Sequence, residues 1–102
     1  MSNPYTGVLG PEEATKEIRS IVKHGSVLTT SHCRLESMRK RNITFHDLLS
    51  VLQNGTVIED PIWDERYENF KCKVEGTTID DGTAIAITVF LDHRSILVIT
   101  IY

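Results

Sequence analysis

Two apolar segments near the C-terminal end, residues 83–91 and 96–102, constrain the fold of this chain more than any other feature. Both are rich in isoleucine, valine and threonine, which favour strands because branched side chains pack well on a pleated surface. Only four residues separate them, so they predict an antiparallel hairpin at the centre of a sheet. Turn signals at Asp60-Pro61 and over 76–82 bound two further predicted strands. These strands are expected at residues 56–59 and 66–75.

The first half of the chain carries helical patterns instead. Residues 11–24 combine a Pro-Glu-Glu start with apolar side chains at helical spacing, which predicts a first helix. Residues 27–29 indicate a short strand or an extended lead-in to a second, short helix over 32–40. A third helix begins at Thr44, where an acidic residue three positions later completes a capping-box pattern, and it ends before Gly55.

Helices followed by a run of strands predict an α+β fold. We expect two or three N-terminal helices packed on one face of an antiparallel sheet of about four strands. Residues 1–10 have no periodicity and predict a loose arm, and residues 11–102 are expected to form a single domain. Four apolar residues of the third helix are expected to be buried against the hairpin, namely Phe45, Leu48, Leu49 and Leu52.

Composition narrows the class of protein. A chain of 102 residues buries roughly two thirds of its unfolded surface, enough for one core without disulfides. Cys33 and Cys72 are therefore expected to be free thiols in a reducing compartment. Their spacing from each other and from the histidines does not fit a zinc site, so neither a metal nor a cofactor is expected. With no long apolar run and no leader pattern, we expect a soluble cytoplasmic protein without a membrane partner.

Charge is distributed unevenly along the chain. The net charge is −3, yet residues 15–42 contain seven basic and two acidic side chains. The acidic remainder concentrates in residues 59–68 and at Asp80 and Asp81. This asymmetry predicts one cationic face that receives an anion, and the alternative is a set of solvated helix faces that happen to be basic.

The cationic stretch also carries a family resemblance. Residues 29–60, TTSHCRLESMRKRNITFHDLLSVLQNGTVIED, and the ending ILVITIY resemble the uncharacterised bacterial domain-of-unknown-function family numbered 4258. The resemblance covers residues 27–102. The layout is also similar to that of the RelE and BrnT toxins, which are small metal-independent ribonucleases of toxin–antitoxin pairs. The resemblance therefore implies a toxin-like ribonuclease acting on RNA phosphodiesters, with RNA as substrate and an antitoxin as partner.

Metal-free RNA cleavage needs a base, an acid, and cations that hold the phosphate. His32 matches the histidine of the family, and Arg39, seven positions later, is expected on the same helix face. The resemblance also implies that the end of the last strand faces this cleft. The candidate catalytic residues are His32, Arg39 and Tyr102. The candidate substrate-binding residues are Arg34, Arg41 and Thr100.

Three of these residues also have structural interpretations that require no ligand. His32 can orient the preceding strand by donating to a backbone carbonyl. Arg39 can pair with Glu36 on the same helix. Tyr102 can be an aromatic side chain packed on the core with its hydroxyl at the surface. The sequence leaves these interpretations open.

A second class of function stays open as well. The isoelectric point of about 5.7 is low for a protein that cuts RNA, because phosphate binding favours basic proteins. The alternative is a non-enzymatic protein-interaction or regulatory module of the same fold. Trp63, within the acidic segment 59–68, would suit a basic partner protein. A homodimer is a further option if the hairpin that begins at Thr83 lies at a sheet edge.

Overall fold

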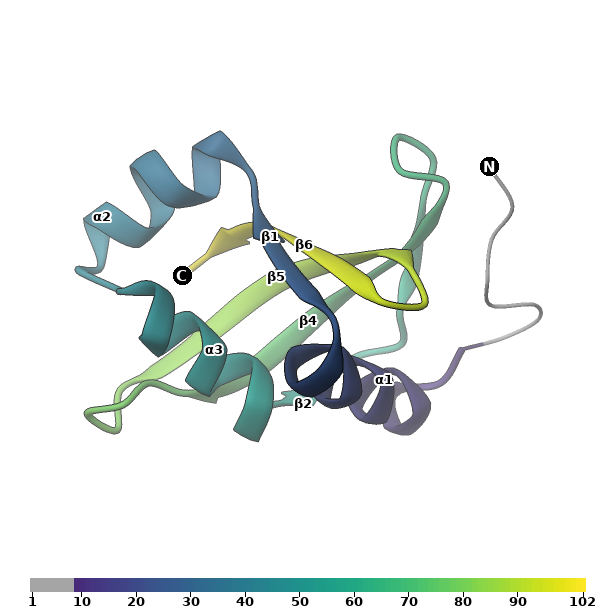
Figure 1. Ribbon diagram of the computed structural model, residues 1–102, viewed down its shortest axis with the longest axis horizontal. Helices are drawn as coiled ribbons and strands as arrows, with labels where there is room; N and C mark the ends of the chain where they lie inside the picture. The colour runs from purple at the N-terminus through teal and green to yellow at the C-terminus, as the bar shows by residue number, and fades with distance from the viewer. Residues whose placement is uncertain (1–8) are drawn as a thin grey trace.

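The structure is a computed structural model that describes residues 9–102 (Figure 1). Its helical segments are α1 (Pro11–His24), the π-helical η1 (Cys33–Ser37), α2 (Met38–Lys40) and α3 (Phe45–Asn54). Its strands are β1 (Ser26–Thr29), β2 (Thr56–Val57), β3 (Ile62–Asp64), β4 (Asn69–Thr77), β5 (Thr83–Asp92) and β6 (Ser95–Ile101). Of the predicted loose arm, residues 1–8 lie outside the described residues, and Leu9 is buried in the core.

The described strands form one mixed sheet of six strands in the order β1-β6-β5-β4-β2, with β3 also paired to β4. The α+β class is confirmed, but about four antiparallel strands were expected. The sheet is mixed because β1 runs parallel to β6, with Thr29 opposite Val98. The count is higher because β1 joins the sheet beside β6 and because the three-residue β3 pairs with the start of β4. The β5–β6 hairpin is antiparallel and lies inside the sheet order, as predicted. β5 has a neighbouring strand on each side, and β1 pairs with Ser95–Val98 of β6.

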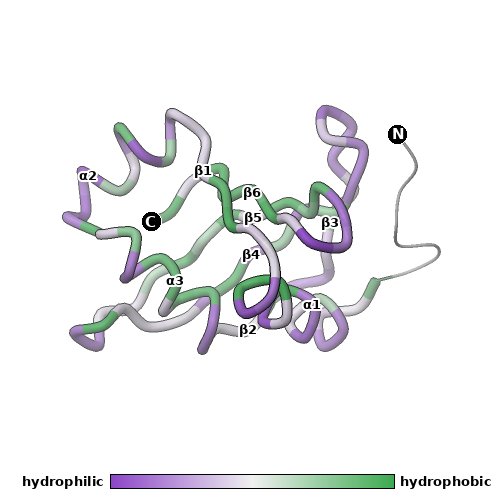
Figure 2. Tube along the Cα trace, in the orientation of Figure 1, coloured by the Kyte–Doolittle hydropathy of each residue, from purple (hydrophilic) through white to green (hydrophobic). Residues whose placement is uncertain are grey.

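Helices α1 and α3 lie side by side against one face of the sheet (Figure 1). Leu48 and Leu52 are buried there as predicted, and Leu49 is half-buried. The prediction for Phe45 is wrong, because this residue begins α3 at the rim of the layer and stays 45% exposed. Val51 completes the buried face of α3 instead. Hydrophilic residues gather in the turns at the ends of the sheet (Figure 2).

Two glycines let α3 approach β4 closely. Gly55 follows α3 with φ −77°, so no left-handed backbone requires a glycine at this position. The requirement for glycine is steric, because a Cβ at Gly55 would lie 2.8 Å from the carbonyl oxygen of Glu75. A Cβ at Gly76 would lie 2.9 Å from the Cα of Gly55 and would also contact the carbonyl oxygen of Val51. Side chains at either position would push the helix away from the sheet.

The start of α3 has the predicted capping box. Thr44 Oγ1 accepts a hydrogen bond from Asp47 N at 3.1 Å, and Asp47 Oδ2 accepts one from Thr44 N at 3.0 Å. The other carboxylate oxygen of Asp47 accepts from the backbone N–H of Ile79 at 3.1 Å. Asp47 therefore ties the start of the helix to the turn between β4 and β5.

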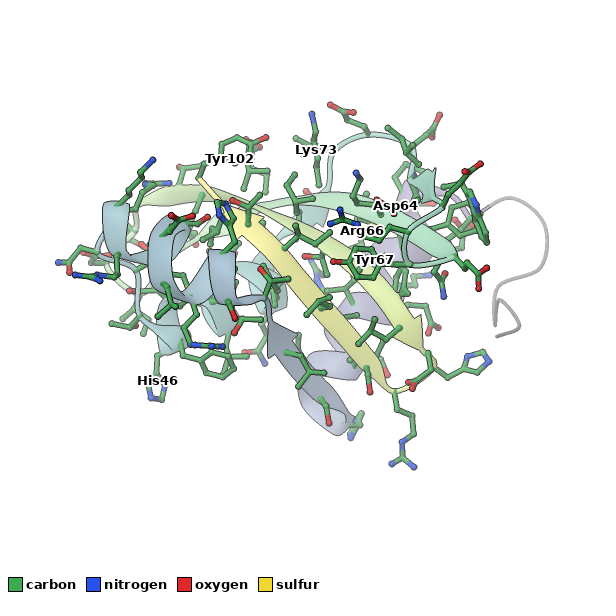
Figure 3. The ribbon with its side chains drawn as sticks, turned by 90° about the horizontal axis from the view of Figure 1, so that it is seen from above. His46, Asp64, Arg66, Tyr67, Lys73 and Tyr102 are labelled. Atoms are coloured by element: carbon green, nitrogen blue, oxygen red, sulfur yellow. The ribbon has the colours of Figure 1, made fainter. Side chains whose placement is uncertain are left out.

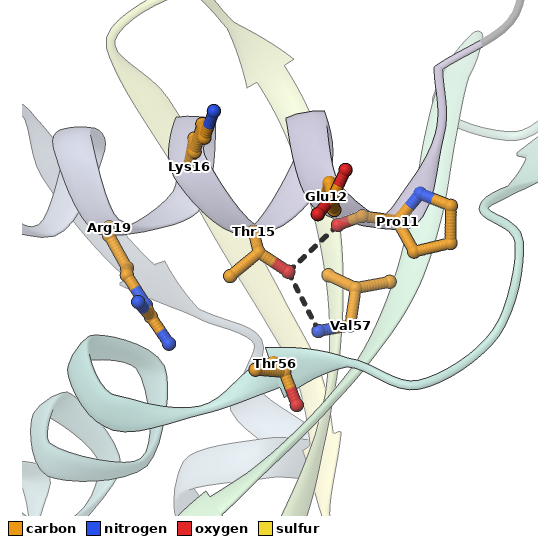
Figure 4. A pocket seen from close by; sticks show the side chains of 7 residues that line it. All are labelled: Pro11, Glu12, Thr15, Lys16, Arg19, Thr56 and Val57. Atoms are coloured by element: carbon orange, nitrogen blue, oxygen red, sulfur yellow. Dashed lines mark hydrogen bonds between the residues drawn. The ribbon is translucent and has the colours of Figure 1, made fainter.

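Helix α1 joins the end of α3 through hydrogen bonds at a hollow of about 240 Å³ (Figure 4). Thr15 Oγ1 donates to Pro11 O at 2.8 Å and accepts from Val57 N at 2.9 Å. Arg19 Nη2 donates to Gly55 O at 2.8 Å and to Asn54 O at 3.3 Å. These polar groups serve the packing of α1 on the domain, so we assign this hollow a structural role.

Candidate active site

The candidate site begins where β1 leaves the sheet. Thr30 N donates to Val98 O at 3.1 Å, and Thr30 Oγ1 donates to Ile99 O at 2.9 Å. The same hydroxyl accepts from Cys33 N at 3.0 Å, so Thr30 also caps the helix that follows. That helix spans residues 31–40, including η1 and α2, and we call it the edge helix. It lies beside the part of β6 that β1 no longer covers (Figure 1).

A π-helical turn alters which side chains of the edge helix share a face. Because η1 is wider than an α-helical turn, side chains align at longer spacing than the α-helical period predicts. Glu36 and Lys40, four and eight positions after His32, line a pocket with it. Arg39 was expected on this face, but it is exposed and does not line the pocket.

The last strand contributes its own irregularity. The sequence pattern predicted Val98, Thr100 and Tyr102 on one side of the sheet, following strict alternation. The alternation breaks at a β-bulge, where Thr88 pairs with Val98 and Ile87 pairs with Thr100. Val98 and Ile101 are consequently both buried in the core, and Thr100 faces the edge helix.

A pocket of about 210 Å³ lies between the edge helix and the end of β6. We call it the His32 pocket, and its lining residues are His32, Glu36, Ser37, Lys40, Arg41, Thr100, Ile101 and Tyr102. Four of the six predicted site residues are among them: His32, Arg41, Thr100 and Tyr102. Arg34 and Arg39 are exposed elsewhere on the edge helix.

Hydrogen bonds hold five side chains of the pocket in place. His32 Nδ1 lies 2.6 Å from Glu36 Oε2, so the histidine pairs with a carboxylate of its own helix. The Ser37 hydroxyl lies 2.7 Å from that of Thr100, and Arg41 Nη2 donates to Thr83 O at 3.1 Å.

Sequence reasoning missed Glu36, Ser37, Lys40 and Ile101 as members of this pocket. Glu36 was interpreted as a partner of the arginines of this stretch, Arg39 among them. The signal for its actual partner was present, because an acidic residue four positions after a histidine is a standard helical pair. Ser37 and Lys40 had no such signal, since their placement depends on the π-helical turn.

Two cationic side chains that line the His32 pocket, Lys40 and Arg41, are not neutralised by an acidic side chain that the structure describes. The segment 59–68 could have folded over the arginines, but Asp64 pairs with Lys71 and Glu59 pairs with Lys73, each at 3.2 Å. Within residues 9–102, no carboxylate forms an ion pair with Lys40 or Arg41. An anion that enters the pocket would therefore meet both cations.

Neither cysteine is suited to serve as a nucleophile. Both Cys33 and Cys72 are buried free thiols. Burial raises the pKa of Cys72 to about 12, and it raises the pKa of Cys33 against the opposing effect of Arg34. Both thiols are therefore protonated near neutral pH.

In the described part of the chain, histidine, cysteine and acidic side chains form no group that could hold a metal ion. No helix among residues 9–102 is long and apolar enough to cross a membrane.

Residues 29–102 match the family described as Domain of unknown function (DUF4258). The chain belongs to this family. The matched region begins at the end of β1 and includes every residue of the His32 pocket, whereas α1 lies outside it. The family inferred from the sequence is thus confirmed, and the similarity to RelE and BrnT toxins stays a prediction. No curated protein and no solved structure matches the chain.

Proposed function

We propose that this protein is a toxin-like, metal-independent ribonuclease that cleaves an RNA phosphodiester in the His32 pocket. One observation carries the proposal: a carboxylate-paired histidine, two cations and a phenol line a single pocket of about 210 Å³. Metal-free cleavage of RNA needs these same kinds of group. An antitoxin would be the natural protein partner of such an enzyme.

His32 is the proposed general base. A neutral imidazole has one donor and one acceptor nitrogen. We assign the proton to Nδ1, because that nitrogen lies 2.6 Å from the Glu36 carboxylate. This assignment leaves Nε2 as the acceptor, and Glu36 then stabilises the imidazolium that forms when Nε2 takes a proton.

Lys40 and Arg41 are the proposed phosphate ligands. Negative charge builds up on the phosphate oxygens during cleavage, and fixed cations stabilise it in the transition state. Hydrogen bonding to Thr83 O positions the guanidinium of Arg41, and its other N–H groups stay available for a phosphate. Arg39, which lies outside the pocket, would contact only a neighbouring phosphate of the RNA.

The proposed reaction conserves atoms and protons. The 2′-oxygen of the RNA attacks phosphorus while its proton moves to His32 Nε2. The bond between phosphorus and the 5′-oxygen breaks, and the leaving oxygen takes the proton of the Tyr102 hydroxyl. The products are a 2′,3′-cyclic phosphate and a 5′-hydroxyl end. Solvent then returns a proton to Tyr102 and accepts one from His32.

Incubation with a short end-labelled RNA in the presence of EDTA tests this proposal. Wild-type protein should yield fragments that end in a 2′,3′-cyclic phosphate. His32→Ala should slow cleavage by about 100-fold or more, which is the usual contribution of a general base. His46→Ala is the matched control, because His46 is exposed on α3, far from Tyr102 in Figure 3. Equal cleavage by wild type and His32→Ala would contradict the proposal.

A non-enzymatic protein-interaction or regulatory module is the second candidate. It is supported by the net charge of −3 and by two exposed apolar residues of β3, Ile62 at 59% and Trp63 at 44%. Complete absence of RNA cleavage by the folded wild-type protein at low salt would make this second candidate the preferred one.

A further inference from the structure

A second and larger pocket adjoins the His32 pocket. It has a volume of about 400 Å³, within the range of small-molecule sites. We call it the Ile87 pocket, and its lining residues are Glu59, Asp60, Ile62, Lys71, Cys72, Lys73, Ile87 and Tyr102. Tyr102 lines both pockets, so the two pockets meet at this residue. Lys73 and Tyr102 lie on the same side of the sheet in Figure 3.

We infer that the Ile87 pocket is a nucleobase subsite. It would hold the base of the nucleotide whose 2′-hydroxyl reacts at His32. The inference rests on the proposed ribonuclease function and adds to it the part of the substrate that the second pocket recognises.

The sheet places residues of the two pockets side by side on neighbouring strands. Ile87 and Thr100 are direct cross-strand partners on β5 and β6. One lines the Ile87 pocket and the other lines the His32 pocket. Side chains of such partners start about 5 Å apart, so a single nucleotide can reach from one pocket into the other.

The lining suits a base better than a second phosphate. Two carboxylates, Glu59 and Asp60, balance the two ammonium groups of Lys71 and Lys73. Such a neutral rim does not favour a dianion. The apolar side chains of Ile62 and Ile87 and the half-exposed ring of Tyr102 offer surfaces on which a base can stack.

The rim also predicts which bases fit. Two ion pairs, Lys73 with Glu59 and Lys71 with Asp64, each at 3.2 Å, fix the charged side chains on one side of the Ile87 pocket. Asp60 lies on the same side and forms no ion pair within residues 9–102. Its carboxylate can accept a hydrogen bond from an exocyclic amino group, which cytosine carries and uracil lacks. The subsite should therefore prefer cytidine to uridine.

Binding of nucleoside 3′-monophosphates, measured by calorimetry, tests this inference. Wild-type protein should bind cytidine 3′-monophosphate about tenfold more tightly than inorganic phosphate, because base stacking adds affinity. It should bind uridine 3′-monophosphate more weakly than the cytidine compound. Ile62→Ala should remove most of the gain over inorganic phosphate, and Asp60→Asn should remove the preference for cytidine.

Ile79→Ala is the matched control for Ile62→Ala. Both isoleucines are exposed, at 65% and 59% respectively, but Ile79 lines neither pocket. The control should bind all three ligands as wild type does. Equal affinity of wild-type protein for inorganic phosphate and for both nucleotides would overturn the subsite, as would an unchanged affinity in Ile62→Ala.

These ligands contain no bond that the enzyme would cut, so the result does not depend on catalysis. Base discrimination without any RNA cleavage would contradict the ribonuclease and support the subsite. Cleavage without base discrimination would contradict the subsite alone.

Discussion

The hydroxyl of Ser37 lies 2.7 Å from the hydroxyl of Thr100, and this hydrogen bond joins the edge helix to the last strand. Ser37 ends the π-helical turn, and Thr100 follows the bulge of β6. Two departures from regular structure thus meet at one wall of the His32 pocket. Such departures recur at functional sites, because they redirect side chains.

Ser37→Ala is expected to lower the free energy of unfolding by about 1 kcal/mol, since the half-buried hydroxyl of Thr100 loses its partner. Thr100→Val should have a similar effect. In the double variant the two losses should not add, and urea denaturation of all four proteins measures the coupling. Strictly additive losses would show that the two hydroxyls do not interact.

Gly76→Ala is expected to lower the free energy of unfolding by about 1–3 kcal/mol. Its methyl group would lie 2.9 Å from Gly55 Cα and against the carbonyl oxygen of Val51, so α3 must shift. Gly10→Ala is the control, because the atoms nearest its Cβ belong to the flexible side chain of Glu13. Thermal unfolding that affects both variants alike would contradict the close approach of α3 and β4.

Arg19→Met is expected to lower the free energy of unfolding by about 1–2 kcal/mol. The substitution keeps an apolar side chain but removes the hydrogen bonds to the carbonyl oxygens of Asn54 and Gly55. Lys16→Met, on the same helix, removes an exposed charge and should leave stability unchanged. Denaturant unfolding compares the two, and equal stability of both variants would contradict the role of Arg19.

Asp47 is expected to make stability depend on pH in the acid range. Hydrogen bonds from the backbone N–H groups of Thr44 and Ile79 lower the pKa of Asp47 below 3.8. The folded state therefore binds this proton less tightly than the unfolded state. The stabilisation is complete above the unfolded pKa and is lost as the pH falls through the folded value. Asp47→Asn should flatten this acid limb in unfolding measured from about pH 5 to pH 2. An identical limb in the variant would contradict the assignment.

The sequence predicted correctly the helices and strands that depend on residues close together in the chain. The Pro-Glu-Glu start gave α1, the Thr44 capping box gave α3, and the density of branched residues gave the β5–β6 hairpin. The pairing of β1 with β6 has no local signal, because it joins segments far apart in the chain. β3 was missed because three residues next to Pro61 are too few for a pattern.

The candidate site was predictable to the extent that regular periodicity holds. Of the six predicted site residues, His32, Arg41, Thr100 and Tyr102 line one pocket, whereas Arg34 and Arg39 do not. The α-helical period predicted Arg39 on the same face as His32. Because of the π-helical turn, Lys40 lies on that face instead. The spacing of apolar and charged residues in this stretch carries no signal for a π-helical turn, so the α-helical period was the only guide to this face.

The central claim is that the His32 pocket receives an RNA phosphate. NMR titration with a short RNA analogue that lacks the reactive 2′-hydroxyl tests this claim most directly. We predict shifts centred on His32, Ser37, Lys40 and Thr100 that weaken steeply with added salt, because phosphate binding releases counterions. No shifts at millimolar ligand and low salt, or shifts centred outside the pocket, would contradict the claim.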